Sequence, residues 1–266
     1  MATTAATGSA ERWGPLWGAR AEDWAKIEEQ QIKTYEEVIR RVGVASGHRV
    51  LEVGCGSGVF LRAAADRGAK VDGLDASEAL IAIARRRVPE AALRVGDMQF
   101  LPYDDDTFDV VTGFNAFFFA ADMVAALREA GRVAKSGAPV VIQVWGRPER
   151  CDLNAVHPVM ARFLPPPDPS AVRGSELWEP GKLEQIAAEA GLAPEGAFDV
   201  SWPLEFPDDQ ALTDALTSAG GLSVIVGPER EPELRTALVE AMAPYRTADG
   251  GYRLENEWHC LVTRAP

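Results

Sequence analysis

The sequence has few cysteines and no long apolar run. Its 266 residues include three cysteines, odd in number and far apart, without a CxxC pair. This pattern argues against a disulfide framework and against a zinc site. No uninterrupted apolar run reaches the roughly 18 residues of a membrane-spanning helix. The opening residues, MATTAATGSAER, lack the charged start and apolar core of a signal peptide. We therefore expect a soluble, reduced, cytoplasmic protein that binds no metal.

Basic residues are also scarce. The 27 Lys and Arg residues face 40 Asp and Glu residues, which gives a formal net charge of −13. A nucleic-acid-binding protein needs a basic face, and an anionic membrane surface attracts basic segments. Neither partner is therefore expected. A hydrophobic content of 47% and a charged content of 25% are ordinary for a globular protein of this length.

The middle of the chain, from Gly43 to Trp145, alternates between strand-like and helix-like segments. Alternation with short connections is typical of a parallel sheet covered by helices on both faces. The expected strands are 48–53, 70–75, 91–97, 107–114 and 138–145, and the expected helices are 59–68, 77–88 and 121–134.

The two ends of the chain are less regular. Residues 13–42 have near-helical apolar spacing and are predicted as two helical segments. Residues 146–174, rich in Pro and Arg, predict an irregular or partly helical excursion that covers a site. The remainder is expected to form a helix over 179–192 with Pro180 near its first turn, a strand over 197–206, helices over 208–220 and 231–245, and a last strand over 252–265.

A glycine-rich turn follows the first expected strand in the stretch VLEVGCGSGVF. Glycine there lets a ligand approach the backbone closely. A dinucleotide site has the spacing GxGxxG, with the pyrophosphate on the following helix. Here Gly54, Gly56 and Gly58 give GxGxG, and Val59 occupies the sixth position. Glu52, just upstream, repels a phosphate but suits an ammonium group, so the turn predicts a ligand with an amino-acid moiety.

Two further acids follow the next two strands. Asp75 ends the second strand, where an acid accepts hydrogen bonds from ribose hydroxyls. Asp97 follows the third strand beside Met98, a pair that suits the amino group and the ring face of adenine. Each acid alone is equally well explained as a helix cap or turn residue. The order and spacing of glycines and acids together predict a nucleoside that carries an amino-acid moiety.

These stretches resemble the successive motifs of a known family. VLEVGCGSG, VDGLDAS, GDMQFLPYDDDTFDVV and GRVAKSGAPVVIQVW are similar to those of the class I S-adenosylmethionine-dependent methyltransferases, in particular the small-molecule group with the type 11 methyltransferase domain. The resemblance covers about 49–145. It implies an α/β, Rossmann-like, doubly wound sheet of seven strands, with the last strand (about 255–263) antiparallel and with a helical cap.

The resemblance also implies the cofactor and its site. S-adenosyl-L-methionine would bind with its methionine part at Glu52 and the glycines and its ribose at Asp75. Ala76 and Met98 would flank the adenine, Asp97 would accept from its amino group, and Phe114 would lie near the sulfonium. The chain would divide into an N-terminal helical cap (1–42), a cofactor-binding core (43–146), a substrate cap (147–178) and a C-terminal part that completes the sheet (179–266).

The sequence defines the methyl acceptor less closely than it defines the cofactor. After the fourth strand the chain has GFNAFFFAAD, not the Asn/Asp-Pro-Pro-aromatic tetrapeptide of many DNA and protein amine methyltransferases. Asn115 is a candidate to orient a polar group of the substrate, or else a turn cap. The candidates for an aromatic and apolar wall and lid around the substrate are Trp17, Trp24, Phe118, Met160 and Phe163. For each of them, packing in the core is the alternative.

Three histidines are available as a general base. His48 precedes the first strand, at the edge opposite the ligand, and His259 lies in the last strand, where core packing is expected. His157 lies in the excursion after the fifth strand and is the candidate base, with a cap or loop role as the alternative. Arginines of the same segment are candidates for an acidic substrate or solvated loop charges.

The sequence therefore predicts a methyltransferase for a small, partly apolar metabolite. Transfer to oxygen or nitrogen is favoured, and transfer to carbon stays open. The alternative from another class is a non-catalytic module that binds the cofactor and stabilises or regulates a partner. An open cavity beside the methyl group would favour the enzyme, whereas a sealed pocket with a large exposed apolar patch would favour the module.

Overall fold

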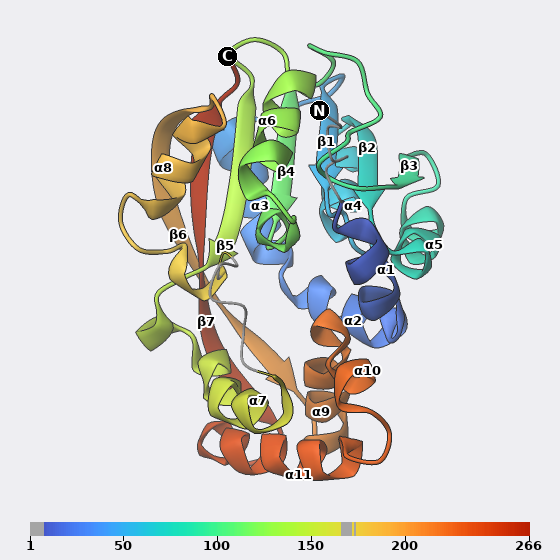
Figure 1. Cartoon of the computed structure of the whole chain (residues 1–266), viewed down its shortest axis with the longest axis vertical. Helices are drawn as coiled ribbons and strands as arrows, with labels where there is room; N and C mark the ends of the chain where they lie inside the picture. Colours follow the sequence, from blue (N-terminus) through green and yellow to red (C-terminus); the bar gives the residue numbers. More distant parts are fainter. Residues whose placement is uncertain (1–7, 166–171, 173) are drawn as a thin grey trace, which may run out of the picture.

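One mixed sheet of seven strands organises the described part of the chain, which in the computed structural model comprises residues 8–165, 172 and 174–266 (Figure 1). The strands are β1 Arg49–Val53, β2 Lys70–Asp75, β3 Ala92–Val95, β4 Val110–Phe114, β5 Pro139–Trp145, β6 Ala193–Phe206 and β7 Tyr252–Arg264.

The strand order is β3-β2-β1-β4-β5-β7-β6. Strands β1 to β5 are parallel, and β7 is antiparallel to both of its neighbours, β5 and β6. The order reverses between β1 and β4, so the carboxyl ends of these strands border the crevice where a doubly wound sheet binds its ligand. The predicted fold and the antiparallel last strand are confirmed.

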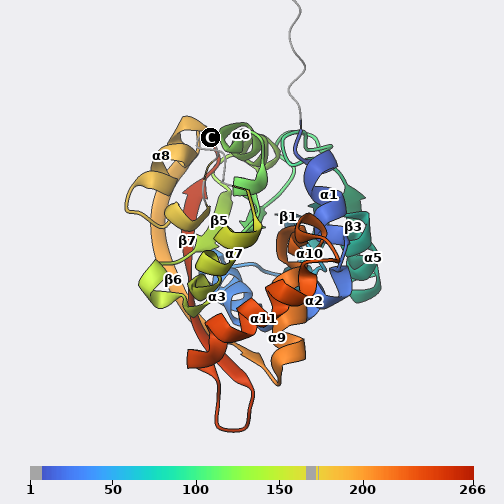
Figure 2. The same ribbon diagram turned by 60° about the horizontal axis from the view of Figure 1, so that its bottom comes forward.

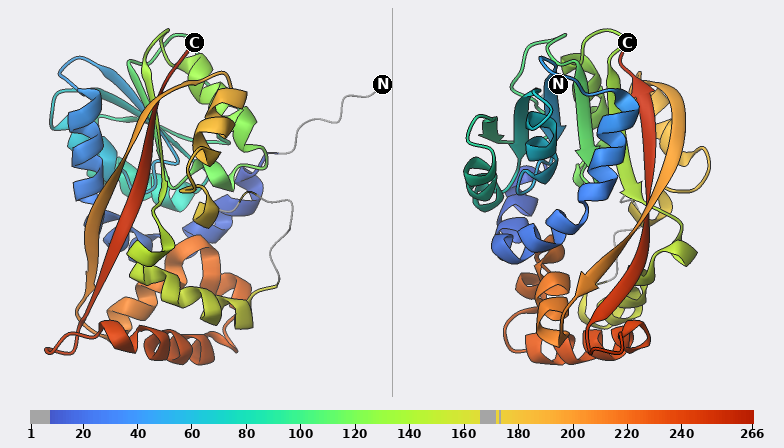
Figure 3. Two further views of the ribbon diagram at one scale, coloured as in Figure 1. Left: turned by 90° about the vertical axis from the view of Figure 1, so that its left-hand side faces the viewer. Right: turned by 180° about the vertical axis from the view of Figure 1, so that it is seen from behind.

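Helices cover both faces of the sheet. The helices are α1 Ala10–Gly18, α2 Ala21–Gln30, α3 Ile32–Val42, α4 Val59–Ala65, α5 Glu78–Arg87, α6 Met123–Val133, α7 His157–Phe163, α8 Lys182–Glu189, α9 Asp209–Ser218, α10 Leu222–Val226 and α11 Glu231–Met242. Helices α3, α4 and α5 pack on one face, and α6 and α8 on the other (Figure 3). Each face buries an apolar cluster, and burial of this kind is the main stabilising contribution to such a fold.

Strands β6 and β7 run on beyond the end of β5. Their pairing extends to Phe206 and Tyr252, whereas β5 ends opposite Trp258. The resulting two-stranded ribbon reaches the helices α7, α9, α10 and α11, which we call the cap lobe (Figure 1). The lobe has apolar clusters of its own, one under the ribbon around Trp258 and one between α7 and α11. Figure 2 views the molecule with this lobe in front of the sheet.

The first two helices connect the sheet to the cap lobe. Helices α1 and α2, called here the N-terminal cap, contact α5 on the sheet side. On the other side α2 contacts α9, and α1 contacts the short turn between α9 and α10. Trp17 and Trp24 pack on an apolar patch of α5 that includes Leu80 and Ile83.

Some local expectations were wrong. The segment predicted as two helices forms three, because Arg20 and Gln31 leave helical geometry. Pro180 does not begin α8, because Gly181 is its N-cap in a left-handed conformation that glycine tolerates best. Helix α10 was not predicted, because its five residues are too few to give a periodic signal. The other predicted strands and helices are confirmed within a few residues of their ends.

Candidate active site

A cavity of about 450 Å³ lies where the carboxyl edge of the sheet meets the N-terminal cap and the cap lobe. Its volume is within the range of small-molecule sites. Tryptophan, phenylalanine and aliphatic side chains supply most of its lining. Four acidic side chains, Glu28, Glu52, Asp75 and Asp97, also line it, and among the described lining residues there is neither lysine nor arginine.

The glycine turn forms one wall of the cavity. Gly54 and Gly56 both have positive φ values, 73° and 51°. A Cβ atom on Gly54 would lie 2.5 Å from the Cβ of Ala116, and one on Gly56 would lie 2.6 Å from a carboxylate oxygen of Glu28. A side chain would be strained at both positions, and at Gly54 it would also collide with Ala116. Gly58 lies behind the turn, where a Cβ would meet Ala84 of α5, and it is outside the cavity lining.

Asp75 is held by backbone donors at the end of β2. Its two carboxylate oxygens accept hydrogen bonds from the N–H of Gly56 at 2.9 Å and of Ser77 at 2.8 Å. Burial raises the pKa of this carboxyl, and the backbone donors oppose the rise. A carboxylate has about four lone-pair sites, so each oxygen keeps capacity for a ligand hydroxyl.

Glu52 is the most isolated acid of the site. It is 2% exposed, and its Oε2 has no hydrogen-bond partner in the described structure. Burial raises its pKa well above the usual range, and the charges of Glu28 and Asp75 add to the rise. A buried acceptor without a donor is costly. A cationic donor such as an ammonium group would satisfy it.

Asp97 joins the N-terminal cap to the sheet edge. It accepts hydrogen bonds from the N–H of Ala10 at 2.7 Å and of Gln99 at 2.9 Å. The predicted adenine acceptor is therefore also bonded to the start of α1. Met98 lines the cavity beside it, and so does Ala76 after β2. Helix α1 covers these residues closely, because a Cβ on Gly14 would collide with the carbonyl of Ala76.

The end of β4 carries Phe114 and Asn115 into the cavity. Phe114 packs against Tyr35 and Phe60, with ring centroids 4.6 and 4.8 Å apart. Asn115 has a φ of 50°, a left-handed conformation that is uncommon outside glycine, and its Oδ1 is buried without a partner. Asn adopts this conformation more readily than other non-glycine residues, so the backbone agrees with a turn, and the unpaired Oδ1 is the feature that suits a polar ligand group.

The predicted aromatic wall is largely present. Trp17, Trp24 and Phe118 line the cavity, together with Met160 of α7. Trp17 contacts Trp24 edge-on, with ring centroids 4.6 Å apart. Phe163 is in a different place: it is buried between α7 and α11, in a cluster with Leu234 and Leu238, and is outside the cavity lining.

His157 begins α7 and lines the cavity from the side of the cap lobe. It retains an exposed surface, yet the surrounding protein desolvates the ring enough to lower its pKa. His259 is only partly buried and lies 2.7 Å from Asp199, so the expected core packing was wrong. Two arginines after β5 lie near acids of the chain itself: Arg147 bonds Glu257 at 3.0 Å, and Arg162 lies 3.8 Å from Glu233.

Sequence reasoning missed two groups of lining residues. The first comprises Glu28 of α2, Gln31 between α2 and α3, and Tyr35 of α3, which are each at least 95% buried. The second belongs to the ribbon and the cap lobe and includes Leu204, Phe206, Leu216, Leu222 and Leu238. No local pattern of the sequence marks the polar members of the first group, because a glutamate and a glutamine in a charged segment are ordinarily solvated.

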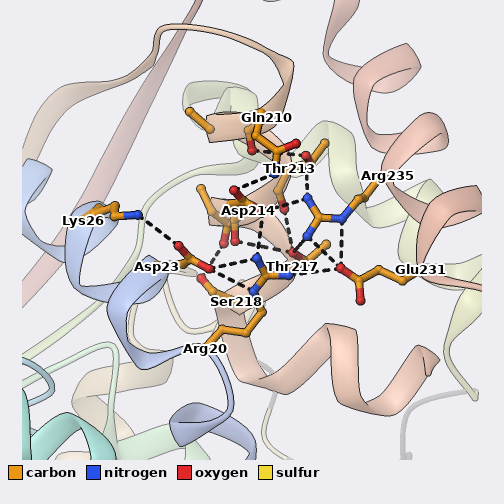
Figure 4. A network of polar contacts seen from close by, with 12 residues as sticks. Arg20, Asp23, Lys26, Gln210, Thr213, Asp214, Thr217, Ser218, Glu231 and Arg235 are labelled. Atoms are coloured by element: carbon orange, nitrogen blue, oxygen red, sulfur yellow. Dashed lines mark hydrogen bonds and ion pairs between the residues drawn. The ribbon is translucent and has the colours of Figure 1, made fainter. Parts of the chain in front are cut away.

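A polar network joins the N-terminal cap to helices α9 and α11 (Figure 4). Arg20, between α1 and α2, donates to Asp214 of α9 at 2.8 Å and to Glu231 of α11 at 3.1 Å. Arg235 of α11 donates to the same two acids, at 2.8 and 2.7 Å. We call these four residues the latch, because they fasten the N-terminal cap to the cap lobe.

Comparison with known proteins agrees with this geometry. The model of a methyltransferase domain family matches residues 51–142. The ubiquinone biosynthesis O-methyltransferase of Pseudomonas aeruginosa (strain LESB58) is 30% identical over 66% of this chain and 77% of its own length. The demethylmenaquinone methyltransferase of Bacillus subtilis (strain 168) is 29% identical over 52% of this chain and 63% of its own. The chain spans just under two thirds of the length of several such curated relatives.

A solved structure extends the likeness over nearly the whole chain. The protein bound to the Trm112 methyltransferase activator of Haloferax volcanii is 25% identical, with a TM-score of 0.61. The match covers 94% of this chain and 96% of that one. Among the described residues, no helix has the length and apolarity needed to cross a membrane, and the cytoplasmic location stays a prediction. The matched domain, the relatives and the strand-end acids together assign the chain to the family of methyltransferases that use S-adenosyl-L-methionine as their cofactor.

Proposed function

We propose that the protein transfers the methyl group of S-adenosyl-L-methionine to a hydroxyl or amine group of a small, largely apolar acceptor. The observation that carries the proposal is the continuity of one cavity, from the glycine turn and Asp75 to the apolar side chains of the cap lobe. A cofactor on the turn and an acceptor under the lobe would share one space with little water. Proximity and orientation supply much of the rate enhancement for such a transfer.

The residues present fit the cofactor. The orphaned oxygen of Glu52 suits its ammonium group, and the spare lone pairs of Asp75 suit the ribose hydroxyls. Ala76 and Met98 would flank the adenine. Phe114 would lie near the sulfur, where an aromatic face favours positive charge. When bound, the cofactor supplies a methyl group on a positively charged sulfur.

The lining also restricts the acceptor. Its acids, together with the absence of lysine and arginine among its described members, disfavour an anionic molecule. The tryptophans and the aliphatic residues of the ribbon favour an apolar body. The names of the relatives in quinone biosynthesis agree with an apolar acceptor, and one of them names an oxygen as the methylated atom.

Two residues are proposed to handle the acceptor's polar group. Asn115 Oδ1, buried and unpaired, would accept a hydrogen bond from one N–H of an amine acceptor and so aim its lone pair. A hydroxyl acceptor has a single proton, which would point at His157 instead. His157 would take the proton that leaves as the new carbon–oxygen or carbon–nitrogen bond forms and the sulfur–carbon bond breaks. Its lowered pKa keeps the imidazole neutral and able to accept a proton at pH 7.

The test is a panel of neutral phenols, alcohols and amines, scored for formation of S-adenosyl-L-homocysteine. We expect turnover of an apolar member and little turnover of carboxylates. Asn115→Gly, which keeps the left-handed backbone but removes the amide, should lower kcat/KM for that acceptor without changing cofactor affinity. Calorimetric binding of the cofactor with no turnover of any acceptor would favour the non-catalytic module instead.

A further inference from the structure

Two buried polar residues near the end of α2, Glu28 and Gln31, line the same cavity as Glu52. Glu28 is 4% exposed and Gln31 is 3% exposed, and both line the cavity. The Oε1 of Gln31 is buried without a partner, as is the Oε2 of Glu52. Two orphaned acceptors, one at the junction of α2 and α3 and one on β1, thus line one cavity. A group rich in N–H donors would satisfy both.

Glu28 occupies the anion position of the glycine turn. Its Oε2 accepts the N–H of Ser57 at 2.8 Å, and Gly56 leaves room for it. Backbone donors at the start of a helix ordinarily hold a phosphate in nucleotide sites. Here they hold a carboxylate of the chain itself, so the turn has no need of an anionic ligand and the added charge favours a cationic one.

The charged groups around Glu28 and Glu52 do not provide a cation that both carboxylates could share. Arg87 of α5 is the basic group that acts on Glu28, and it is bonded to Ser57 and Glu29. Asp75 acts on Glu52 and adds negative charge. No cluster of three or more metal-binding side chains occurs among the described residues, so a metal ion is a poor candidate for the missing charge.

We propose that Glu28 and Gln31 are cofactor-binding residues, which join Glu52 around the ammonium group of the cofactor's amino-acid end. The proposal rests on the cofactor site described under the proposed function. It makes the N-terminal cap part of that site, so that the cap closes over a bound cofactor and the two carboxylates share one cation. The ammonium group would attract both carboxylates and so offset the Coulomb repulsion between them.

Calorimetry with two ligands tests the proposal. S-adenosyl-L-homocysteine carries the amino-acid end, and 5′-methylthioadenosine has the same nucleoside without it. Glu28→Gln can still accept from Ser57, so the cap keeps its anchor while the charge is lost. We expect this variant to bind the first ligand at least tenfold more weakly and the second with unchanged affinity. Gln31→Met, a second variant of similar volume, should weaken only the first ligand, by severalfold.

The matched control is Glu22→Gln, the same change at an exposed position of the same helix. It should leave both affinities unchanged. Equal weakening of the two ligands by Glu28→Gln, or no weakening of the first, would overturn the proposal. If the unmutated protein binds neither ligand, the proposed function itself fails, and that result is distinct from the other two.

Discussion

Arg20 and Asp214 lie 2.8 Å apart although one precedes α2 and the other belongs to α9. Both side chains are less than a quarter exposed, and Arg235 reaches the same carboxylate at 2.8 Å. The cap lobe and the N-terminal cap are therefore connected by a shared acid rather than by an isolated surface pair.

From the contacts of the latch we predict that Arg20→Met weakens the attachment of the N-terminal cap to the cap lobe. The substitution leaves Asp214 and Glu231 with Arg235 as their remaining basic partner in the latch. Networks of partly buried ion pairs contribute more than exposed pairs, so we expect a loss of about 1–2 kcal/mol in the free energy of unfolding. Hydrogen exchange should quicken in α1 and α2. The control is Arg86→Met, which removes an exposed pair with Glu22; equal effects of the two changes would rule out a special role for the latch.

Asp75 should control cofactor affinity. Asp75→Asn keeps one acceptor but places an amide nitrogen against the N–H of Gly56 or of Ser77, and it weakens the bonds to ribose hydroxyls. A loss of about 10- to 100-fold in affinity for S-adenosyl-L-homocysteine is expected. Asp72→Asn on the same strand changes a buried acid that pairs with Arg49, and it should affect stability alone. Unchanged affinity in Asp75→Asn would contradict the assigned site.

The strand-end residues were predictable because local rules place them. In a parallel sheet all carboxyl ends meet at one edge, so Glu52, Asp75 and Asp97 had to converge once the strands were recognised. Glu28 follows no such rule. Its position depends on how α2 packs on α5 and the glycine turn, and a glutamate in a charged helix is ordinarily solvated.

The cavity residues of the cap lobe were not predictable from local sequence patterns either. Leu216 and Leu238 belong to helices whose apolar residues are equally compatible with packing on the sheet. Their place around the cavity is set by the ribbon of β6 and β7, which carries the chain beyond the end of β5. Pairing over such a sequence distance leaves no local pattern. The apolar acceptor site was for this reason expected in 147–178, in the N-terminal helices and after the fourth strand, and not in the C-terminal helices.

The buried acid Glu28 should make stability depend on pH. Burial raises its pKa from 4.5 to about 7, against the opposing effect of the Ser57 and Val59 backbone donors and of Arg87. Between these two pH values the folded state binds the proton and the unfolded state does not. Stability therefore falls as pH rises through this window and stays low above it. Three other titratable side chains, Tyr35, Glu52 and Asp75, line the same cavity as Glu28.

Glu28→Gln removes that titration. For the cofactor-free protein we expect the variant to gain about 2–3 kcal/mol over the unmutated chain at pH 8, and to differ little from it near pH 4.5. Urea unfolding at the two pH values measures the difference. A gain that is the same at both values would show that packing, rather than the charge, separates the two proteins.

His157 should set the pH dependence of turnover. Partial burial lowers its pKa from 6.5, and no neighbouring charge contributes to this shift. A base acts in its neutral form, so kcat should rise with pH through an apparent pKa below about 6.5 and then level off. His157→Gln should lower kcat by about 10²-fold and remove this acidic limb, with cofactor affinity unchanged. His259→Gln, which changes a histidine paired with Asp199 in β6, should keep the limb. If the limb persists in His157→Gln, the proton leaves by another route, and proximity and orientation remain as the means of catalysis.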